Sequence, residues 1–332
     1  MSKNSNIIAV TMGDPSGVGT EIAIRAKIKK IKKPDFFIIH DIDFVKKILK
    51  KMKSKLKVRE ISSPSEVKKL PKNYLAVLPI KISKNTQLGK KNLSNVKSIL
   101  TSIDLAVKLA KNGEVAAIVT NPINKDVIGK KVKNFKGHTE YLAKKDRTND
   151  QLTMMMNKNL KTIPLTTHIA INKVSNKINK KNIIKAIINA NVSLRKDFKI
   201  KKPRIAVTAL NPHAGDGGLI GDDEKVKILP AIKYCKKKKI SVEGPLPADS
   251  AFIKNNQNKY DIFICMFHDQ ALIPVKMISF DETVNYTAGL SFVRTSPDHG
   301  TGLDIAKKFI ASPNSLIAAL KSASKIAQAR RK

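Results

Sequence analysis

Short apolar runs that resemble β-strands alternate along this chain with segments of helical periodicity, and this alternation restricts the possible folds more than any other feature. The runs are nearly continuous in aliphatic residues and Phe, which is typical of strands covered on both faces. They lie at Ile7–Thr11, Phe36–His40, Leu75–Pro79, Ala116–Thr120, Thr162–Thr167, Ile205–Leu210, Ile262–Phe267 and Leu290–Thr295. Such alternation predicts an α/β protein built on mostly parallel sheet.

Two helices stand out between these runs. Apolar residues recur at helical spacing from Asn92 to Lys111, and Gly113 is placed to end that helix. A second helix is expected at Asn182–Arg195. The chain has 332 residues, which is enough for about two domains with separate cores. Because no Pro/Gly/Ser-rich linker marks a boundary, we allow for a discontinuous arrangement in which the chain crosses twice between domains.

The chain is strongly basic. It has 64 Lys and Arg against 26 Asp and Glu, a formal net charge of +38. The lysines form short runs scattered from end to end, as at Lys29–Lys33, Lys50–Lys53 and Lys236–Lys239, and aromatic residues make up only 5%. No basic tail or basic stripe interleaved with aromatics is present. We therefore interpret most lysines as a solvated surface and expect no specific nucleic-acid partner; a nucleic-acid-binding or scaffold protein is the non-enzyme alternative.

Cysteine usage and hydropathy predict the compartment. Two cysteines, Cys235 and Cys265, do not make a disulfide framework in a chain of this length. No stretch approaches the roughly 18 apolar residues of a membrane-spanning helix, and the N-terminus lacks the features of a signal peptide. We expect a cytoplasmic protein without membrane contact.

Three of the six histidines come within three residues of the end of a strand-like run: His168, His213 and His268. Ligands of open α/β sheets bind beyond the carboxyl ends of the strands, so these side chains are candidates for one site. Three imidazoles with open coordination positions are typical of a catalytic zinc-type centre. The alternative is three unrelated loop histidines. His40 also ends a strand-like run, and we assign it a structural role.

The loops around these histidines are rich in Gly, Asp, Asn and Pro. Asn211–Gly218 is denser in glycine than a simple connection requires, and glycine allows a backbone to approach a ligand closely. Asp249 and Asp269 each orient a histidine or contact substrate, or else cap a helix. The segment Gly13–Gly19 does not have the spacing of a dinucleotide-binding GxGxxG motif, so a Rossmann domain is not supported and a tight turn before a helix is expected.

Arg294 lies inside an apolar strand-like run, where an arginine needs an anionic partner. Lys276 and Asn285 precede it, and a glycine-bearing loop at Ser296–Gly302 follows. A single lysine carries little weight among 64 basic residues, so Arg294 is the strongest candidate of these for binding an anion.

Taken together, the motifs resemble the 4-hydroxythreonine-4-phosphate dehydrogenases of vitamin B6 biosynthesis. The matching blocks run in order from residue 10 to residue 306 and are VTMGDPSGVGTEIA, VTNPINKDVI, GHTEYLA, TTHIAI, NPHAGDGGLIGDDE, GPLPADSAF, MFHDQALIPVKM and VNYTAGLSFVRTSPDHGTGLDIA. The resemblance implies two α/β/α domains of the isocitrate/isopropylmalate-dehydrogenase-like superfamily, with the active site in the interdomain cleft at the dimer interface of a homodimer. It places a first domain at 1–133 with 300–332 and a second, carrying the metal histidines and dimer contacts, at 134–299.

The same resemblance implies roles for individual residues. The metal ligands are His168, His213 and His268, holding one divalent ion per site, with zinc ahead of cobalt or magnesium. The substrate-binding residues are His138, Thr139, Lys276, Asn285 and Arg294, to which Asp249 and Asp269 are added, and Lys276 is the candidate acid or base. The cofactor-binding residues are His299, Gly300 and Asp304, in a loop that resembles the adenine-side loop of the wider superfamily.

The implied reaction is oxidation of the C3 hydroxyl of 4-phosphooxy-L-threonine with NAD rather than NADP. The β-keto acid product, 2-amino-3-oxo-4-phosphooxybutanoate, loses CO2 to give 3-amino-2-oxopropyl phosphate. One alternative is a related metal- and NAD-dependent dehydrogenase of another phosphorylated hydroxy acid, such as a tetronate 4-phosphate. Another is a metal-dependent hydrolase or lyase that uses the three histidines without NAD.

Overall fold

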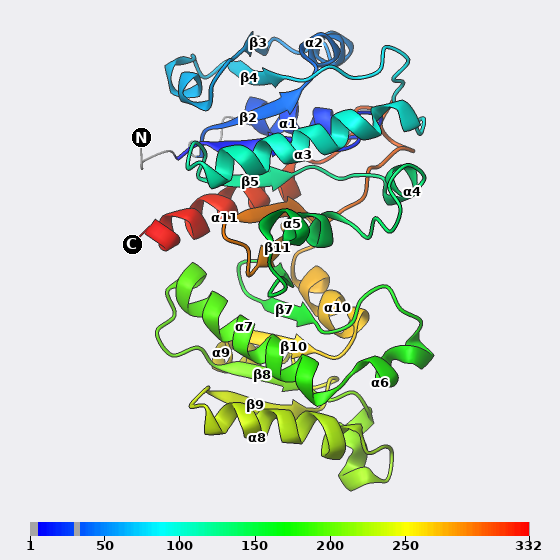
Figure 1. The fold of residues 1–332 in the computed structure, drawn as a ribbon, viewed down its shortest axis with the longest axis vertical. Helices are drawn as coiled ribbons and strands as arrows, with labels where there is room; N and C mark the ends of the chain where they lie inside the picture. Colours follow the sequence, from blue (N-terminus) through cyan, green and yellow to red (C-terminus); the bar gives the residue numbers. More distant parts are fainter. Residues whose placement is uncertain (1–5, 30–33, 332) are drawn as a thin grey trace. The chain divides into compact units, whose positions relative to one another are not determined.

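The computed structural model describes residues 6–29 and 34–331, and these form two compact units (Figure 1). Unit 1 comprises the chain up to Asn149 together with Leu290–Arg331, and unit 2 comprises Asp150–Gly289. The chain therefore enters unit 2 once and returns once to unit 1. The domain boundaries proposed from the sequence lie at 133/134 and 299/300 instead, so they assign the segments 134–149 and 290–299 to the other domain. Lysines 30, 32 and 33 of the first lysine run lie outside the described residues.

The sheet of unit 1 has the strand order β3-β4-β2-β1-β5-β12, and every pairing in it is parallel. Its strands are β1 (Ile8–Thr11), β2 (Phe36–His40), β3 (Lys57–Glu60), β4 (Tyr74–Pro79), β5 (Ala117–Thr120) and β12 (Arg294–Pro297). The strands β1, β2 and β5 are buried along their whole length. This burial on both faces explains why they are apolar without alternation.

Helices cover both faces of this sheet. They are α1 (Gly19–Ile28), α2 (Ile42–Lys51), α3 (Val96–Lys111), α4 (Lys125–Gly129), α5 (His138–Asp146) and α11 (Asn314–Arg331), with 3-10 turns at Pro64–Lys69 and Leu93–Asn95. Figure 1 shows α3 on one face and α1 with α11 on the other. On the α3 side, Ile99, Ile103 and Ala106 pack against the apolar residues of β1 and β2.

The sheet of unit 2 has the order β11-β6-β7-β10-β8-β9. Its strands are β6 (Leu152–Met156), β7 (Lys161–Pro164), β8 (Ile205–Thr208), β9 (Val242–Leu246), β10 (Ile262–Cys265) and β11 (Val284–Ala288). The strand β6 pairs antiparallel with both β11 and β7, and the remaining pairings are parallel. The predicted α/β class with mostly parallel sheet is therefore confirmed.

The helices of unit 2 also lie on both faces of its sheet. They are α6 (Val174–Lys177), α7 (Lys180–Phe198), α8 (Leu229–Lys237), α9 (Lys254–Lys259) and α10 (His268–Ile278), with short turns at Ile171–Lys173, Pro212–Gly218 and Glu224–Ile228. In Figure 1, α7 lies in front of the strands and α10 behind them. Ala271 and Val275 of α10 pack with Met155 and Phe263 in the core.

Both predicted helices form, as α3 and α7, and Gly113 follows α3 with a φ of 73°. Seven of the eight strand-like runs become strands at nearly the predicted positions. The predicted run Leu290–Thr295 is wrong in position, because the strand begins only at Arg294. The backbone N–H and hydroxyl of Ser291 both donate to the Asp146 carboxylate, so this residue is held by a side chain rather than by a neighbouring strand.

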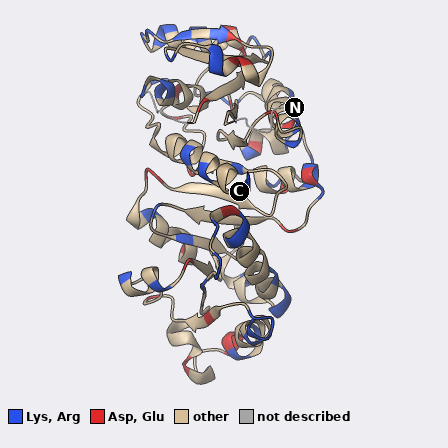
Figure 2. Ribbon diagram, turned by 90° about the vertical axis from the view of Figure 1, so that its left-hand side faces the viewer, with Lys and Arg blue, Asp and Glu red and all other residues tan. Residues whose placement is uncertain are grey.

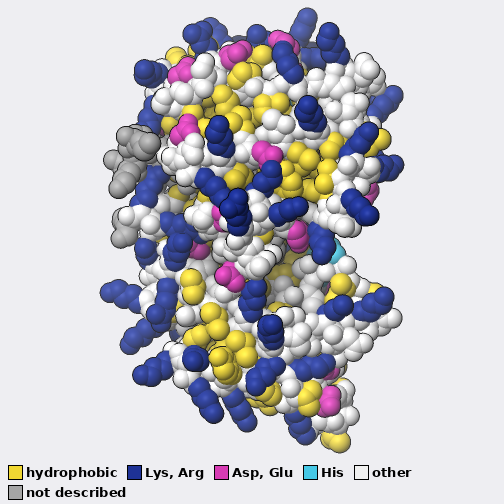
Figure 3. All heavy atoms as spheres, in the orientation of Figure 1, with side chains coloured by type: hydrophobic (Ala, Val, Ile, Leu, Met, Phe, Trp, Pro, Cys, Tyr) yellow, Lys and Arg dark blue, Asp and Glu magenta, His cyan; other side chains and the backbone are white. Residues whose placement is uncertain are grey.

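Lysines and arginines lie on elements of both units rather than on one face (Figure 2), and side chains of Lys and Arg are spread over the whole visible surface in Figure 3. Among the described residues, no helix is long and apolar enough to cross a bilayer. Cys235 and Cys265 are both buried free thiols.

His40 has the structural role assigned to it. It is 1% exposed, its Nδ1 accepts a hydrogen bond from the Asp41 backbone N–H at 2.8 Å, and its Nε2–H donates to the Thr20 hydroxyl at 2.9 Å. The ring stacks on Phe44. Burial lowers the pKa of His40 to about 4, against a smaller opposing effect of Asp41.

This burial predicts a pH-dependent stability. Because the pKa of His40 is about 4 in the folded chain and about 6.5 when unfolded, the unfolded chain binds more protons between these values. The free energy of unfolding should therefore fall by about 2–3 kcal/mol more for the wild type than for His40→Gln between pH 7 and pH 4.5. Urea unfolding of both proteins at the two pH values measures the difference. Equal pH dependence of the two proteins would show that His40 is not held neutral.

Candidate active site

Three loops meet at the carboxyl ends of β1, β5 and β12 in unit 1. The backbone N–H of Asp14, in the loop after β1, donates to the Pro122 carbonyl in the loop after β5 at 2.8 Å. Four residues later, the N–H of Val18 donates to the carbonyl of Thr301, in the segment after β12, at 2.9 Å. The edge where ligands of parallel sheets bind is thus built from segments more than 100 residues apart in the sequence.

Two glycines allow this close approach. A Cβ added to Gly17 would lie 2.4 Å from the Thr301 carbonyl oxygen. Gly13 has a φ of 69°, and a Cβ there would lie 2.6 Å from the Pro122 oxygen. The tight turn expected for Gly13–Gly19 is present, but it serves to pack three loops together rather than only to start a helix.

Buried polar atoms without hydrogen-bond partners among the described residues gather in these loops. They are Thr11 Oγ1, Asp14 Oδ2, Ser16 Oγ and Asn121 Oδ1. Buried polar groups normally find partners, so a concentration at strand ends indicates a place for a polar ligand. Burial raises the pKa of Asp14, against a smaller lowering by the Ser16 N–H, which donates to Asp14 Oδ1 at 2.9 Å. Asp14, Ser16 and Asn121 were not predicted from the sequence. Their position directly after β1 and β5 was a signal, but the lack of partners for their buried atoms was not.

Arg294 and His138 lie beside each other in the same unit. Arg294, the first residue of β12, is 2% exposed, and its Nε and one terminal nitrogen both donate to the Thr120 hydroxyl at 3.0 and 2.6 Å. Burial lowers the pKa of Arg294 to about 9, with Glu140 acting in the opposite direction. His138 and Thr139 begin α5 and are partly buried.

The surroundings of His138 favour the neutral form of its imidazole. Burial lowers its pKa well below the usual range, and the nearby charges of Arg294 and Lys125 lower it further. Its Nε2 is buried and has no hydrogen-bond partner among the described residues. A bound anion beside Arg294 would offset the cost of keeping that guanidinium out of water.

The expected cofactor loop follows β12. His299 Nδ1 donates to the Gly300 carbonyl at 2.9 Å, and its buried Nε2 has no partner among the described residues. Gly300 and Asp304 are exposed. Within unit 1, the loop therefore offers one imidazole nitrogen that a ligand could bind, next to the loops that hold Asp14 and Asn121.

In unit 2, His168 and His268 come close together. They follow β7 and β10, which pair in parallel, and their ring centroids are 6.0 Å apart. His268 is the first residue of α10, and its Nδ1 lies 2.7 Å from Asp269 Oδ1. A carboxylate on Nδ1 is the usual device that fixes the ring orientation and leaves Nε2 to bind a metal.

His213 is presented by an unusual loop. The backbone at His213, Ala214 and Asp216 has positive φ values of 51°, 55° and 42°, within the turn Pro212–Gly218. Glu224, which is 3% exposed, anchors the start of this loop by accepting from the backbone N–H groups of Leu210 and Asn211 at 2.8 and 2.9 Å.

Asn211 also donates through Nδ2 to Glu224 Oε2 at 3.0 Å, so one carboxylate fixes two consecutive residues of the loop. Glu224 was not predicted as a site residue, although it is the last residue of the matching block NPHAGDGGLIGDDE.

The remaining candidates are distributed over unit 2. Lys276 lies on α10 with its Nζ 5.5 Å from the Phe280 ring centroid, Asn285 lies on β11, and Asp249 is exposed after β9.

Within residues 6–29 and 34–331, no three His, Cys, Asp or Glu side chains are grouped closely enough to hold a metal ion. The structure thus pairs His168 with His268 and leaves His213 outside the pair. Two imidazoles with an orienting carboxylate still fit part of the donor set of a divalent cation.

Comparisons with known proteins place these features in one family. The family model described as "Pyridoxal phosphate biosynthetic protein PdxA" matches residues 32–323. A curated 4-hydroxythreonine-4-phosphate dehydrogenase from Caulobacter vibrioides is 39% identical, covering 98% of this chain and 99% of its own. One from Sulfurihydrogenibium is 38% identical, covering 95% and 97%.

Solved structures agree with the sequence relatives. The crystal structure of 4-hydroxythreonine-4-phosphate dehydrogenase from Klebsiella pneumoniae has a TM-score of 0.89 at 34% identity, covering 98% of this chain and all of that one. A terephthalate 1,2-cis-dihydrodiol dehydrogenase from Burkholderia xenovorans has a TM-score of 0.63 at 22% identity, which shows a shared fold only.

The buried Asp14 carboxylate predicts a gain in stability when its charge is removed. Asp14→Asn keeps the oxygen that accepts from the Ser16 N–H and should raise the free energy of unfolding at pH 7 by about 1 kcal/mol. Because the pKa of Asp14 is raised in the folded chain, its charge costs stability at high pH, and the gain should vanish below pH 3.8, where both states are protonated. Chemical unfolding of Asp14→Asn and of the exposed control Asp304→Asn measures this. Destabilisation by Asp14→Asn at pH 7 would contradict it.

Proposed function

The chain belongs to the family of pyridoxal phosphate biosynthetic protein PdxA, and we propose from this premise that it is a 4-hydroxythreonine-4-phosphate dehydrogenase. It oxidises the C3 hydroxyl of 4-phosphooxy-L-threonine: the hydroxyl proton goes to a base, and the hydride on C3 goes to a nicotinamide. The resulting 2-amino-3-oxo-4-phosphooxybutanoate loses CO2 from C1, and protonation at C2 gives 3-amino-2-oxopropyl phosphate. This reaction serves pyridoxal phosphate biosynthesis.

Within the structure, the buried Arg294 is the observation that supports this proposal most strongly. The substrate has a phosphate and a carboxylate, and a desolvated guanidinium beside the neutral His138 suits an anion of this kind. Thr139 adds a hydroxyl donor at the start of α5. We assign His138, Thr139 and Arg294 to the anionic groups of the substrate, with Asn285, Asp249 and Asp269 as further substrate-contacting residues.

We propose NAD as the hydride acceptor. Oxidation of the substrate alcohol needs a hydride acceptor, for which a nicotinamide is suited, and the protein contributes its placement. The loops of unit 1 support a polar ligand of this kind, since Asp14, Ser16 and Asn121 each keep a buried polar atom for which the described residues provide no partner. His299, Gly300 and Asp304 are the residues proposed for cofactor binding.

A divalent metal is proposed on His168, His213 and His268, with zinc ahead of cobalt or magnesium. Such an ion would lower the pKa of the substrate hydroxyl and polarise the developing ketone. The 6.0 Å pair of His168 and His268 supports two of the ligands, and Asp269 holds the His268 ring in one orientation. Because imidazole binds several divalent metals, the chain does not by itself select one.

Lys276 is the proposed acid or base for the hydroxyl or enol proton. It lies on α10, the helix that His268 begins, so the two side chains are positioned by the same element. An ammonium–amine pair is suited to this role when its surroundings favour loss of the proton. A loss of turnover larger than the loss of substrate binding in Lys276→Ala would support that role.

We also propose a cytoplasmic homodimer. The helix α10 and the residues after it expose Ile273, Met277 and Phe280, which are 56, 82 and 69% accessible in the single chain. Apolar side chains exposed on α10 and directly after it favour burial against a second copy. The free thiols of Cys235 and Cys265 are compatible with a reducing compartment.

The activity is tested by NADH formation at 340 nm with purified protein, NAD and 4-phosphooxy-L-threonine, together with detection of 3-amino-2-oxopropyl phosphate. We expect stoichiometric NADH and amino ketone. A tetronate 4-phosphate, which lacks the amino group, is the matched alternative substrate and should turn over at least tenfold more slowly. Turnover of the tetronate alone, or no NADH from a folded protein under any metal, would contradict the proposal.

The proposed role of Asp269 predicts a change in metal affinity that does not depend on turnover. Removing a carboxylate that orients a ligating histidine typically weakens metal binding about 10- to 100-fold. Competition of the protein with a chromophoric chelator for Zn²⁺ should show this loss for Asp269→Asn and a larger one for His268→Ala. Asp281→Asn, an exposed carboxylate of the same unit, is the control. Wild-type affinity in His268→Ala would refute the metal site.

A further inference from the structure

A cavity of about 670 Å³ lies in unit 1 between the ends of α1 and α2, and none of the residues assigned above lines it. Its walls come from the last turns of both helices, the segment 51–56, the turn at 72–73 and the segment 308–309. Seven of its lining residues are basic and none is acidic; the basic ones are Arg25, Lys27, Lys51, Lys53, Lys55, Lys72 and Lys308. It is therefore a strongly cationic hollow outside the catalytic residues.

The helices explain only some of these charges. Cations in the last turn of a helix stabilise its negative end, which accounts for Arg25, Lys27 and Lys51. Lys53, Lys55, Lys72 and Lys308 lie outside helices. Within the described part of the chain, no ion pair joins any of these four lysines to a carboxylate. Their mutual repulsion is thus not offset by acidic neighbours in the walls.

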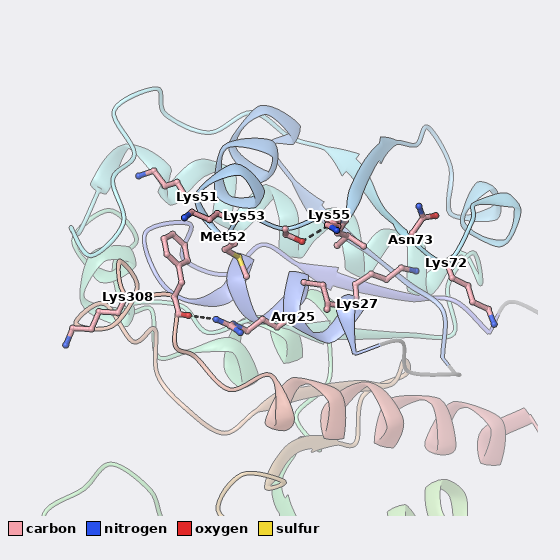
Figure 4. A pocket seen from close by; sticks show the side chains of 13 residues that line it. Arg25, Lys27, Lys51, Met52, Lys53, Lys55, Lys72, Asn73 and Lys308 are labelled. Atoms are coloured by element: carbon pink, nitrogen blue, oxygen red, sulfur yellow. Dashed lines mark hydrogen bonds between the residues drawn. The ribbon is translucent and has the colours of Figure 1, made fainter.

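In Figure 4, Arg25, Lys27 and Lys55 lie toward the middle of the view, and Lys51 and Lys53 lie together near Met52. Lys308 and Lys72 extend outward on opposite sides. Arg25 is fixed by donating to Glu21 at 2.7 Å and to the Phe309 carbonyl. Lys27 is partly buried, and this burial lowers its pKa, against a smaller effect of Asp35.

The remaining walls are apolar. Ile28, Met52, Leu56 and Phe309 contribute aliphatic, thioether and aromatic surface. The volume is many times that of a phosphate ion and lies within the range of about 300–1,000 Å³ typical of sites for small organic ligands. Cations around an apolar hollow match a ligand that has a flat apolar body and a phosphate group.

We propose that this cavity is a second, non-catalytic binding site for an aromatic phosphate ester. The phosphate pairs with Lys53 and Lys55 of the segment 51–56, and the ring lies against Met52 and Phe309. The ligand bridges α1, α2 and the segment that follows Lys308, so its binding stabilises unit 1.

The test uses 1-naphthyl phosphate, whose fluorescence is readable because the chain contains no Trp. Titration into the whole protein is compared for the wild type, Lys53→Glu/Lys55→Glu, and Lys237→Glu/Lys239→Glu, an equal charge change at exposed lysines of unit 2. A fourth protein, Arg294→Gln, separates the cavity from the proposed substrate anion site. Thermal unfolding establishes that each variant is folded.

We expect at least tenfold weaker binding in Lys53→Glu/Lys55→Glu and less than a twofold change in the other two variants. Dehydrogenase turnover of Lys53→Glu/Lys55→Glu should stay within twofold of the wild type. Neutral 2-naphthalenemethanol should bind at least tenfold more weakly than the phosphate.

Three results would overturn the proposal. Equal losses in both double-lysine variants would mean that net charge alone attracts the probe. Loss in Arg294→Gln with retention in Lys53→Glu/Lys55→Glu would place the probe in the substrate site. Binding of inorganic phosphate as tight as that of the naphthyl ester would mean that the apolar wall contributes nothing.

Discussion

The burial of the Arg294 guanidinium is the constraint on which the organisation of unit 1 depends. A charge that is 2% exposed is costly, and the cost appears as a pKa lowered to about 9. Two hydrogen bonds to the Thr120 hydroxyl hold the group at the junction of β12 and β5, and the nearby Glu140 favours its charged form. Arg294 begins β12, but Thr120 is the last residue of β5, so these contacts hold the guanidinium at the carboxyl end of β5.

In both units, polar side chains gather where strands end, but the groups that gather there differ. In unit 1, polar atoms of Asp14 and Asn121 are held out of water by loops that glycine allows to touch. In unit 2, His168 and His268 meet because β7 and β10 are parallel neighbours, so residues that follow both strands emerge side by side. His213 depends instead on a left-handed loop anchored by Glu224, and its position is set by side-chain hydrogen bonds rather than by the sheet.

Much of this could be predicted from the sequence because the central strands are buried on both faces and hence apolar throughout. Four strands were missed. Two of them, Leu152–Met156 and Val284–Ala288, pair antiparallel with each other, and Thr or Asn interrupts their apolar residues. The other two lie at edges of the sheet. The edge strand Lys57–Glu60 is largely exposed and charged, and the edge strand Val242–Leu246 contains Gly and Pro, which central strands avoid. The position of His168 and His268 directly after strand-like runs correctly predicted that these two side chains lie close together. The sequence could not show the buried polar atoms of Asp14 and Asn121, because their lack of partners arises only when loops distant in sequence pack together.

The most direct test of the account is calorimetric binding of 4-phosphooxy-L-threonine, without cofactor, to the wild type and to Arg294→Gln. Arg204→Gln, which removes an exposed guanidinium paired with Asp261, is the control. Charge-assisted hydrogen bonds to a desolvated arginine contribute about 1.5–3 kcal/mol, so we expect a loss of roughly 10- to 100-fold in affinity for Arg294→Gln and none for the control. Unchanged affinity in a folded Arg294→Gln protein would contradict it, because the buried cation would then have no part in holding the substrate.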